Sequence, residues 1–217
     1  MENLSFIQKI IVFAPPVLLA ITVHEAAHGF VASKLGDPTA KMLGRVTLNP
    51  IKHIDPIGTI LLPLLMMWQT SFLFGWAKPV PVTWSNLRNP KKDMVLVALA
   101  GPGSNLIMAV CWAIILKIGL LLGNEQVWFA EPMVWMGSAG IYINSILMVL
   151  NLLPLPPLDG DRVIAGLLPG PWAWKFNKIE PYGLFILLAL LVTGVLQTIL
   201  SGPINGFGRL LHYLIGL

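Results

Sequence analysis

The sequence predicts an all-α polytopic membrane protein of about five to six transmembrane or re-entrant segments, with short β-like strands associated with the membrane. Of the 217 residues, 56% are hydrophobic and only 11% are charged, whereas about 25% of the residues in soluble domains are charged. The apolar residues also come in long blocks, and a helix of about 20 such residues crosses a bilayer. We therefore expect residues 1–217 to form a single integral membrane domain.

The apolar blocks are the expected membrane segments. The first should be a retained helix rather than a removable signal peptide, because ionisable residues lie within it and no small-residue cleavage site follows it. The later blocks are separated by loops that contain charged residues, proline or glycine. The long blocks and a shorter last one are residues 10–33, 56–76, 94–122, 132–155, 182–200 and 203–217.

Charge is distributed unevenly between the loops. The net charge of +4 comes from lysine and arginine residues that cluster at residues 34–52, 78–92 and 162–178, whereas residues 123–131 contain neither. The positive-inside rule then places the basic loops in the cytoplasm and the other loop outside. No basic helix with interleaved aromatic residues is present, so we expect no nucleic-acid partner. Cys111 is the single cysteine, which excludes a disulfide framework and a thiolate metal cluster.

Segment 56–76 cannot be a simple crossing if both loops beside it are cytoplasmic. Proline and glycine interrupt it, and a proline inside a helix removes a backbone hydrogen bond. We expect a re-entrant or broken segment that dips into the membrane and returns to the same side. Such backbone is tolerated at membrane depth only where it is buried in protein or lines a wet cavity. The interrupting residues are Pro56, Gly58, Pro63 and Gly75.

Two short pieces are predicted to be extended rather than helical. They are "GRVTLNP" at residues 44–50 and "AKPVPVTW" at residues 77–84. Both mix β-branched residues with turn formers, a composition typical of edge strands. We expect them to form the β-like strands.

The motif "HEAAH" lies inside the first apolar block, where ionisable groups are costly unless something compensates them. His24 and His28 are four residues apart, so a helix places both on one face, one turn from each other. In the H-E-x-x-H pattern the two histidines bind zinc and the glutamate, here Glu25, is the general base. The alternative is a pair of hydrogen-bonded histidines packed inside a helical bundle.

Catalytic zinc usually has three protein ligands and an open position, so a third ligand is needed. His53 and His212 lie beside basic residues and are expected at the membrane surface. Asp159 lies in "NLLPLPPLDGDR", directly after an apolar run, and the prolines before it forbid a regular helix. A carboxylate on such an opened turn can reach inward to a metal. The alternative for Asp159 is an ordinary helix-ending turn.

Together, three motifs resemble the signatures of the site-2 protease family of intramembrane zinc metalloproteases. They are "HEAAH" at residues 24–28, "AGPGSN" at residues 100–105 and "NLLPLPPLDG" at residues 151–160. In addition, "GWAKPVPV" at residues 75–82 resembles the compact branch of the family, which lacks PDZ domains. The resemblance covers about residues 20–165; the long segment 56–76 departs from the family, and residues 180–217 carry no signature.

The resemblance implies a catalytic core at residues 10–165 that holds one zinc ion per chain. It implies His24, His28 and Asp159 as the zinc ligands and Glu25 as the general base. The cation would compensate the buried carboxylate and give both imidazoles a partner, which explains how this cluster can exist at membrane depth.

The resemblance also suggests residues that hold the substrate or the transition state. Asn151 is the asparagine of the third motif, and Asn105 of the second motif is a weaker candidate whose alternative role is helix packing. The extended piece at 77–84 could pair with an unwound substrate as an added strand, although its prolines limit pairing to alternate positions. The alternative is a packed interfacial lid. The pairing residues would be Lys78, Pro79, Val80, Pro81 and Val82.

The function expected from the resemblance is hydrolysis of peptide bonds in or near transmembrane segments of membrane-protein substrates, in the plasma membrane of a prokaryote. The active site should open towards the cytoplasmic side, and residues 180–217 should form C-terminal helices that are candidates for a gate. One alternative is a zinc-binding transporter or an inactive relative, and another is a structural membrane protein whose polar residues hold helices together. The sequence leaves the substrate and the oligomeric state open.

Overall fold

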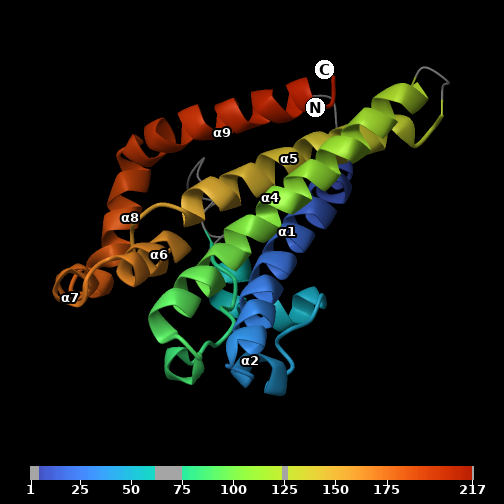
Figure 1. Ribbon diagram of the computed structural model, residues 1–217. Coiled ribbons are helices and arrows are strands. Elements are labelled where there is room, and N and C mark those ends of the chain that lie inside the picture. The colour runs from blue at the N-terminus through green and yellow to red at the C-terminus, as the bar shows by residue number, and fades with distance from the viewer. Residues whose placement is uncertain (1–4, 62–74, 124–126, 217) are drawn as a thin grey trace.

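The computed structural model describes residues 5–61, 75–123 and 127–216, and all regular secondary structure in these ranges is helical (Figure 1). Three of the helices, α1 (Phe6–Leu35), α4 (Pro90–Gly123) and α5 (Ala130–Asn151), are long and apolar enough to cross a membrane. A bent pair of helices near the C-terminus raises the number to four if the pair counts as one span. The all-α class is confirmed, and the described residues contain fewer candidate spans than the five to six transmembrane or re-entrant segments predicted.

The first predicted span matches α1, and both of its ends have defined caps. At the start, the Ser5 hydroxyl accepts a hydrogen bond from the Gln8 backbone N–H while the Gln8 side chain accepts one from the Ser5 backbone N–H. This reciprocal arrangement is a capping box, which satisfies two otherwise unpaired donors. At the other end, Gly36 adopts a φ of 118°, a left-handed conformation that favours glycine and ends the helix.

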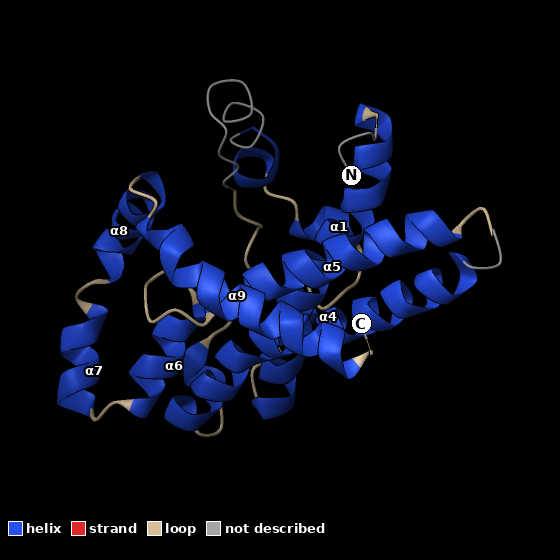
Figure 2. Ribbon diagram, turned by 90° about the horizontal axis from the view of Figure 1, so that it is seen from above, coloured by secondary structure: helices blue, strands red, loops and turns tan. Residues whose placement is uncertain are grey.

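Helices α1, α4 and α5 all pack against one another, and small residues allow the close approach (Figures 1 and 2). A Cβ atom added at Gly137 of α5 would lie 2.8 Å from the Leu116 backbone of α4. One added at Gly140 would lie 2.2 Å from the Trp112 ring. Small residues at helix contacts are the usual basis of packing in membranes, where burial of apolar groups from water gives no driving force.

The chain after α5 turns back through short helices, and the predicted span 182–200 is broken. The short helices are α6 (Asp159–Leu167), α7 (Gly170–Asn177) and α8 (Gly183–Val192). The longer helix α9 (Val195–Leu214) follows them and packs along α5 (Figure 2). The helical arms before and after the break meet at 81°. Thr193 binds the Ala189 carbonyl of its own helix, and Gly194 follows with a φ of 75°. The break separates what the hydropathy pattern predicts as one helix.

The predicted strands at 44–50 and 77–84 are absent from the described residues, where these pieces form turns, bends and irregular backbone. The physical reason is that side chains bind the backbone groups that would otherwise form hydrogen bonds to a neighbouring strand. Arg45 Nη2 donates to the carbonyl oxygens of Lys78 at 2.8 Å and Pro79 at 3.3 Å. Pro79 and Pro81 have no N–H to donate.

Only the ends of segment 56–76 lie within the described residues, and they lie side by side. A π-helix covers Pro56–Leu61, and the Trp76 N–H donates to the Gly58 carbonyl at 3.1 Å. A segment that returns to the side from which it entered must bring its ends together in this way. Residues 62–74, the middle of the predicted re-entrant segment, lie outside the described residues, so the re-entrant path stays a prediction.

Asp37, directly after α1, joins that end of the helix to the segment around residue 83. It is fully buried, and its carboxylate accepts hydrogen bonds from Thr39, from the Thr83 N–H at 2.7 Å and from Asn86 Nδ2 at 3.0 Å. Burial alone would raise the pKa of Asp37, but these hydrogen bonds outweigh it and hold the pKa below its usual value. The carboxylate is therefore a fixed anchor for the loop that lies against α1.

We predict that Asp37→Asn destabilises the protein, because the neutral amide loses charge-assisted hydrogen bonds worth about 1.5–3 kcal/mol. Thermal unfolding in detergent measures the effect, with the exposed Lys41→Gln on the short helix α2 (Thr39–Met42) as a control. Because the folded-state pKa of Asp37 is lowered, its contribution is complete above about pH 3.9 and is lost as the pH falls further. Equal unfolding temperatures of Asp37→Asn and wild type at neutral pH would contradict this role.

Candidate metal centre

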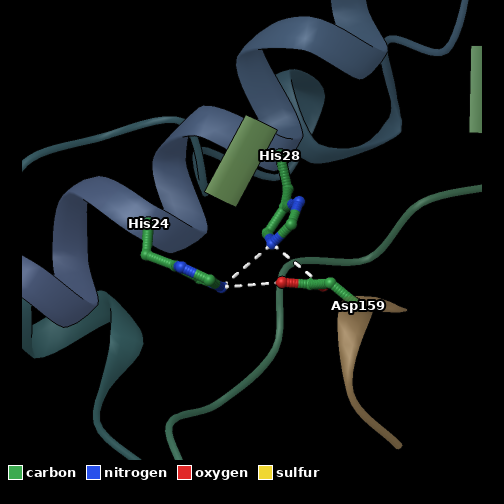
Figure 3. A group of neighbouring side chains, drawn as sticks. All are labelled: His24, His28 and Asp159. Atoms are coloured by element: carbon green, nitrogen blue, oxygen red, sulfur yellow. Dashed lines mark hydrogen bonds and ion pairs between the residues drawn. The ribbon is translucent and has the colours of Figure 1, made fainter. Parts of the chain in front are cut away.

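Three predicted ligands from distant parts of the chain converge at one point (Figure 3). His24 and His28 lie one turn apart on α1, and Asp159 is the first residue of α6. The two Nε2 atoms are 3.1 Å apart. Asp159 Oδ2 is 3.2 Å from His24 Nε2, and Asp159 Oδ1 is 3.3 Å from His28 Nε2. The structure therefore brings both imidazoles and the carboxylate within reach of a single ion.

The turn before α6 carries Asp159 to this point, and Gly160 makes the approach feasible. A Cβ atom at Gly160 would lie 2.2 Å from the Leu153 carbonyl oxygen and 2.5 Å from that of Leu152. The absence of a side chain allows the start of α6 to pack against the end of α5. A carboxylate in the first turn is also favoured by the helix dipole.

Hydrogen bonds at the other ring nitrogens fix the tautomers of both histidines. His28 Nδ1 is 2.7 Å from the Val97 carbonyl oxygen, which can only accept, so Nδ1 carries the proton. His24 Nδ1 is 2.6 Å from Asn105 Oδ1. The amide of Asn105 is oriented by its Nδ2, which donates to the Ala20 carbonyl at 3.2 Å, so Oδ1 also accepts. In the neutral histidines both Nε2 atoms are therefore acceptors.

The candidate metal centre thus places three hydrogen-bond acceptor groups next to one another inside the protein. Two Nε2 lone pairs and a carboxylate repel each other there unless a cation lies between them. Asp159 Oδ2 is buried and receives no hydrogen bond in the described structure. A tetrahedral zinc ion with bonds of about 2.0–2.1 Å has ligand atoms about 3.3–3.4 Å apart. The spacing and the donor types of this group both fit zinc, with a fourth position open.

The side chain of Asn105 orients the imidazole ring of His24. It is fully buried on α4, and its Nδ2 also donates to Asn144 Oδ1 of α5 at 2.9 Å. Asn144 Nδ2 in turn donates to the Gly140 carbonyl at 2.8 Å. This chain of amides connects α1, α4 and α5 at the metal centre, and groups that orient metal ligands in this way strengthen metal binding.

Sequence reasoning missed two residues of the centre. Asn144 is a lone amide in the apolar run "SAGIYINSILMVL", and a polar residue in such a place is a signal that could have found it. Gly101 lies inside the second motif. A Cβ atom there would lie 2.4 Å from His28 Nε2 and 2.6 Å from His24 Nε2. Gly101 keeps the space beside the ligand atoms open, and only the folded backbone shows it.

Glu25, the predicted base, is half-buried on α1 and touches the segment predicted to pair with substrate. Its Oε2 accepts a hydrogen bond of 2.8 Å from the Val80 N–H. A Cβ atom at Gly29 would meet Val80 Cγ1 at 3.0 Å, so this segment crosses α1 close to the metal ligands. The predicted strand residues therefore lie beside the candidate base, but as irregular backbone.

The other histidines and the other asparagine that the sequence analysis considered are not part of the three-ligand group. Asn151 donates through Nδ2 to the Leu147 carbonyl of its own helix at 2.9 Å and is not hydrogen-bonded to the three ligands. His53 is buried, with 2% of its surface exposed, and its Nε2 is 3.0 Å from the Thr47 carbonyl oxygen. The location of His53 at the membrane surface stays a prediction. His212 is exposed on α9.

We predict that Gly101→Ala lowers zinc affinity at least about tenfold, because the new methyl group displaces the ligand nitrogens. Gly103→Ala is the matched control, since a Cβ atom there meets nothing within 4 Å. Chelator competition on the purified proteins in detergent gives both affinities. Equal zinc affinities for the two variants would show that Gly101 does not border the metal.

A second prediction concerns the amides. Asn105→Ala should weaken zinc binding about 10–100-fold, the range found when a group that orients a metal ligand is removed. Asn151→Ala, which loses a bond only to its own helix, should keep wild-type affinity. The same competition assay tests this pair, and the reverse order of effects would contradict the arrangement.

Comparison with known proteins identifies related chains over most of the sequence. The protein is 42% identical over 190 residues to "Putative zinc metalloprotease YwhC" of Bacillus subtilis, covering 87% of this chain and 84% of the relative. It is 30% identical over 198 residues to "Putative zinc metalloprotease Rip2" of Mycolicibacterium smegmatis, covering 89% and 71%. The Rip2 protein of Mycobacterium tuberculosis H37Rv is 30% identical over 185 residues, covering 84% and 66%.

No family model and no solved structure matches the chain. These two relatives nevertheless align with more than four fifths of this chain at 30% identity or more. The chain belongs to the family of zinc metalloproteases that is represented by YwhC and Rip2.

Proposed function

We propose that this protein is an intramembrane zinc metalloprotease of the site-2 protease type, which hydrolyses peptide bonds in or near transmembrane segments of membrane proteins. The observation that carries the proposal is that Asp159 of α6 meets His24 and His28 of α1, a helix apolar enough to span a membrane, with Glu25 on the same helix. The names of the relatives support a metalloprotease. The position of the centre within α1 supports chemistry in the membrane.

We assign zinc to the three converging side chains. His24 and His28 offer Nε2, and their Nδ1 protons are held by Asn105 and Val97, which keeps both rings oriented. Asp159 offers a carboxylate oxygen. Zinc bound there supplies Lewis-acid polarisation of the scissile carbonyl and lowers the pKa of a water molecule from about 15.7 towards 7.

Glu25 is assigned the proton transfers. The Val80 N–H holds its Oε2, so we assign Oε1 to the attacking water: it takes a proton there and later returns it to the leaving amine. The half-buried position of Glu25 lets water reach the carboxylate while the neighbouring ligands stay buried. A carboxylate held at one oxygen needs little reorganisation between the two transfers.

Substrate contact is proposed for the segment at 77–84 and for Asn151. Arg45 and Glu25 bind the segment on one side, which fixes it across α1 next to the metal centre. An unwound substrate would pair with the Val80 carbonyl or with backbone groups of Val82, because the Lys78 N–H donates to the His53 carbonyl and the Lys78 carbonyl accepts from Arg45. Asn151 lies at the end of α5, eight residues before Asp159, and the second N–H of its Nδ2 would donate to the substrate or the oxyanion.

We place the centre towards the cytoplasmic side of the plasma membrane of a prokaryote. His28 is seven residues from the end of α1 at Leu35, about 10 Å at 1.5 Å per residue. The loop that follows is rich in lysine and arginine, and such loops are cytoplasmic. Water would therefore enter over a short distance from that side.

We predict that Glu25→Gln abolishes cleavage and keeps the metal. Loss of a general acid–base group costs about 10²–10⁴-fold in rate, whereas the zinc ligands are unchanged. The assay is cleavage of a single-pass model substrate by the purified protein in detergent, with zinc content measured on the same samples. Glu131→Gln, an exposed glutamate in the first turn of α5, is the matched control.

Three outcomes separate the candidate functions. If wild type and Glu131→Gln cleave while Glu25→Gln binds about one zinc and does not, the proposal stands. If all three bind zinc and none cleaves a panel of substrates, a zinc transporter or an inactive relative explains the centre better. If none binds zinc, the assignment of the centre is wrong.

A further inference from the structure

A second polar site lies away from the metal centre, between α5 and α9. A cavity of about 820 Å³ opens there. Its polar lining includes Ser138 and Tyr142 from α5 and Asn205, Arg209, His212 and Tyr213 from α9. None of the residues that line it is acidic. The site takes no part in the chemistry described above, and its residues come from two helices that pack side by side (Figure 2).

Arg209 is the residue that most needs an explanation. Its Nε donates to the Asn205 carbonyl one turn back, at 3.4 Å, and no carboxylate of the described residues forms an ion pair with it. An arginine beside a membrane-spanning helix is costly unless it reaches the interface or binds an anion. The guanidinium has four further N–H donors on its terminal nitrogens. Its position in a basic cavity points to an anionic ligand.

The end of α9 indicates where this ligand comes from. Arg209 lies five residues before the last residue of α9, Leu214, about 8 Å along the helix. Lys117 of α4 binds the Gly216 carbonyl just beyond that end at 3.1 Å. Histidine and tyrosine next to the arginine are residues typical of the membrane interface. The cavity is therefore close enough to a membrane surface for a lipid headgroup.

The donors in the cavity suit a phosphate. Arg209 offers a planar fork, which matches phosphate oxygens, and His212 has a ring N–H. Tyr142 and Tyr213 bring hydroxyl groups from the two helices. Ser138 is already committed, because its hydroxyl donates to the Val134 carbonyl at 2.8 Å. With no carboxylate in the lining, a headgroup that carries an ammonium group has no charged partner for it.

The flanks of the cavity suit acyl chains. Ile141 of α5 and Ile204 of α9 line the cavity itself and give it an apolar part. A ligand with one anionic end and an apolar body satisfies both the donors and these side chains. We propose that the cavity between α5 and α9 binds an anionic phospholipid, with the lipid phosphate on Arg209. The proposal does not depend on the protease activity.

Lipid retention by the intact protein tests the proposal. Delipidated wild type in detergent is titrated with phosphatidylglycerol or phosphatidylcholine, and bound lipid is counted by native mass spectrometry. Wild type should bind one phosphatidylglycerol about tenfold more tightly than phosphatidylcholine, and Arg209→Gln should lose that preference. Lys9→Gln is the matched control, since it removes one positive charge from an exposed residue of α1 that does not line the cavity.

A further variant and controls for folding complete the test. Tyr142→Phe keeps the ring and loses one donor, so it should lower phosphatidylglycerol retention by a smaller factor than Arg209→Gln. Zinc content and unfolding temperature show whether each variant is folded. Equal losses for Arg209→Gln and Lys9→Gln would overturn the site, as would equal binding of both lipids by wild type. Competition by millimolar inorganic phosphate would show that free phosphate, and not a lipid, is the ligand.

Discussion

The structure depends on one electrostatic constraint: three acceptor groups face each other inside a helical membrane protein. His24 and His28 are held with their protons on Nδ1, so their Nε2 lone pairs point at the same place as the Asp159 carboxylate. Without a cation, this arrangement would lose the solvation of a carboxylate and gain only repulsion. With zinc, each acceptor has a partner. The donor atoms of this cluster therefore fit a metal centre.

Close packing is what permits the cluster to form. Gly101 leaves room beside the two ligand nitrogens, and Gly160 lets the start of α6 approach the carbonyls at the end of α5. The amides of Asn105 and Asn144 then connect the three long helices at the depth of the centre. In hydrocarbon such hydrogen bonds and small-residue contacts replace the burial of apolar groups from water as the forces that hold helices together. The same residues therefore both form the candidate metal centre and hold the three long helices together.

The parts that sequence reasoning predicted are those with local signals. Spacing alone puts His24 and His28 on one face, and the prolines before Asp159 predict the turn that delivers it. Long apolar runs predict α1, α4 and α5. The strands at 44–50 and 77–84 were not found in the described residues, because Arg45 and Glu25 bind the backbone there, and no local pattern reveals a partner that far along the chain. The break at Gly194 likewise depends on one φ angle within a continuous apolar run.

The central claim is that His24, His28 and Asp159 hold zinc, and X-ray absorption at the zinc edge of the purified protein tests it most directly. The account predicts about one zinc per chain, with two imidazole nitrogens and oxygen ligands at about 2.0–2.2 Å and no sulfur. Replacement of His53, which lies outside the centre, should leave the spectrum unchanged. A zinc-free protein from zinc-replete cells, a spectrum with sulfur ligands, or a spectrum with a single imidazole would contradict the account.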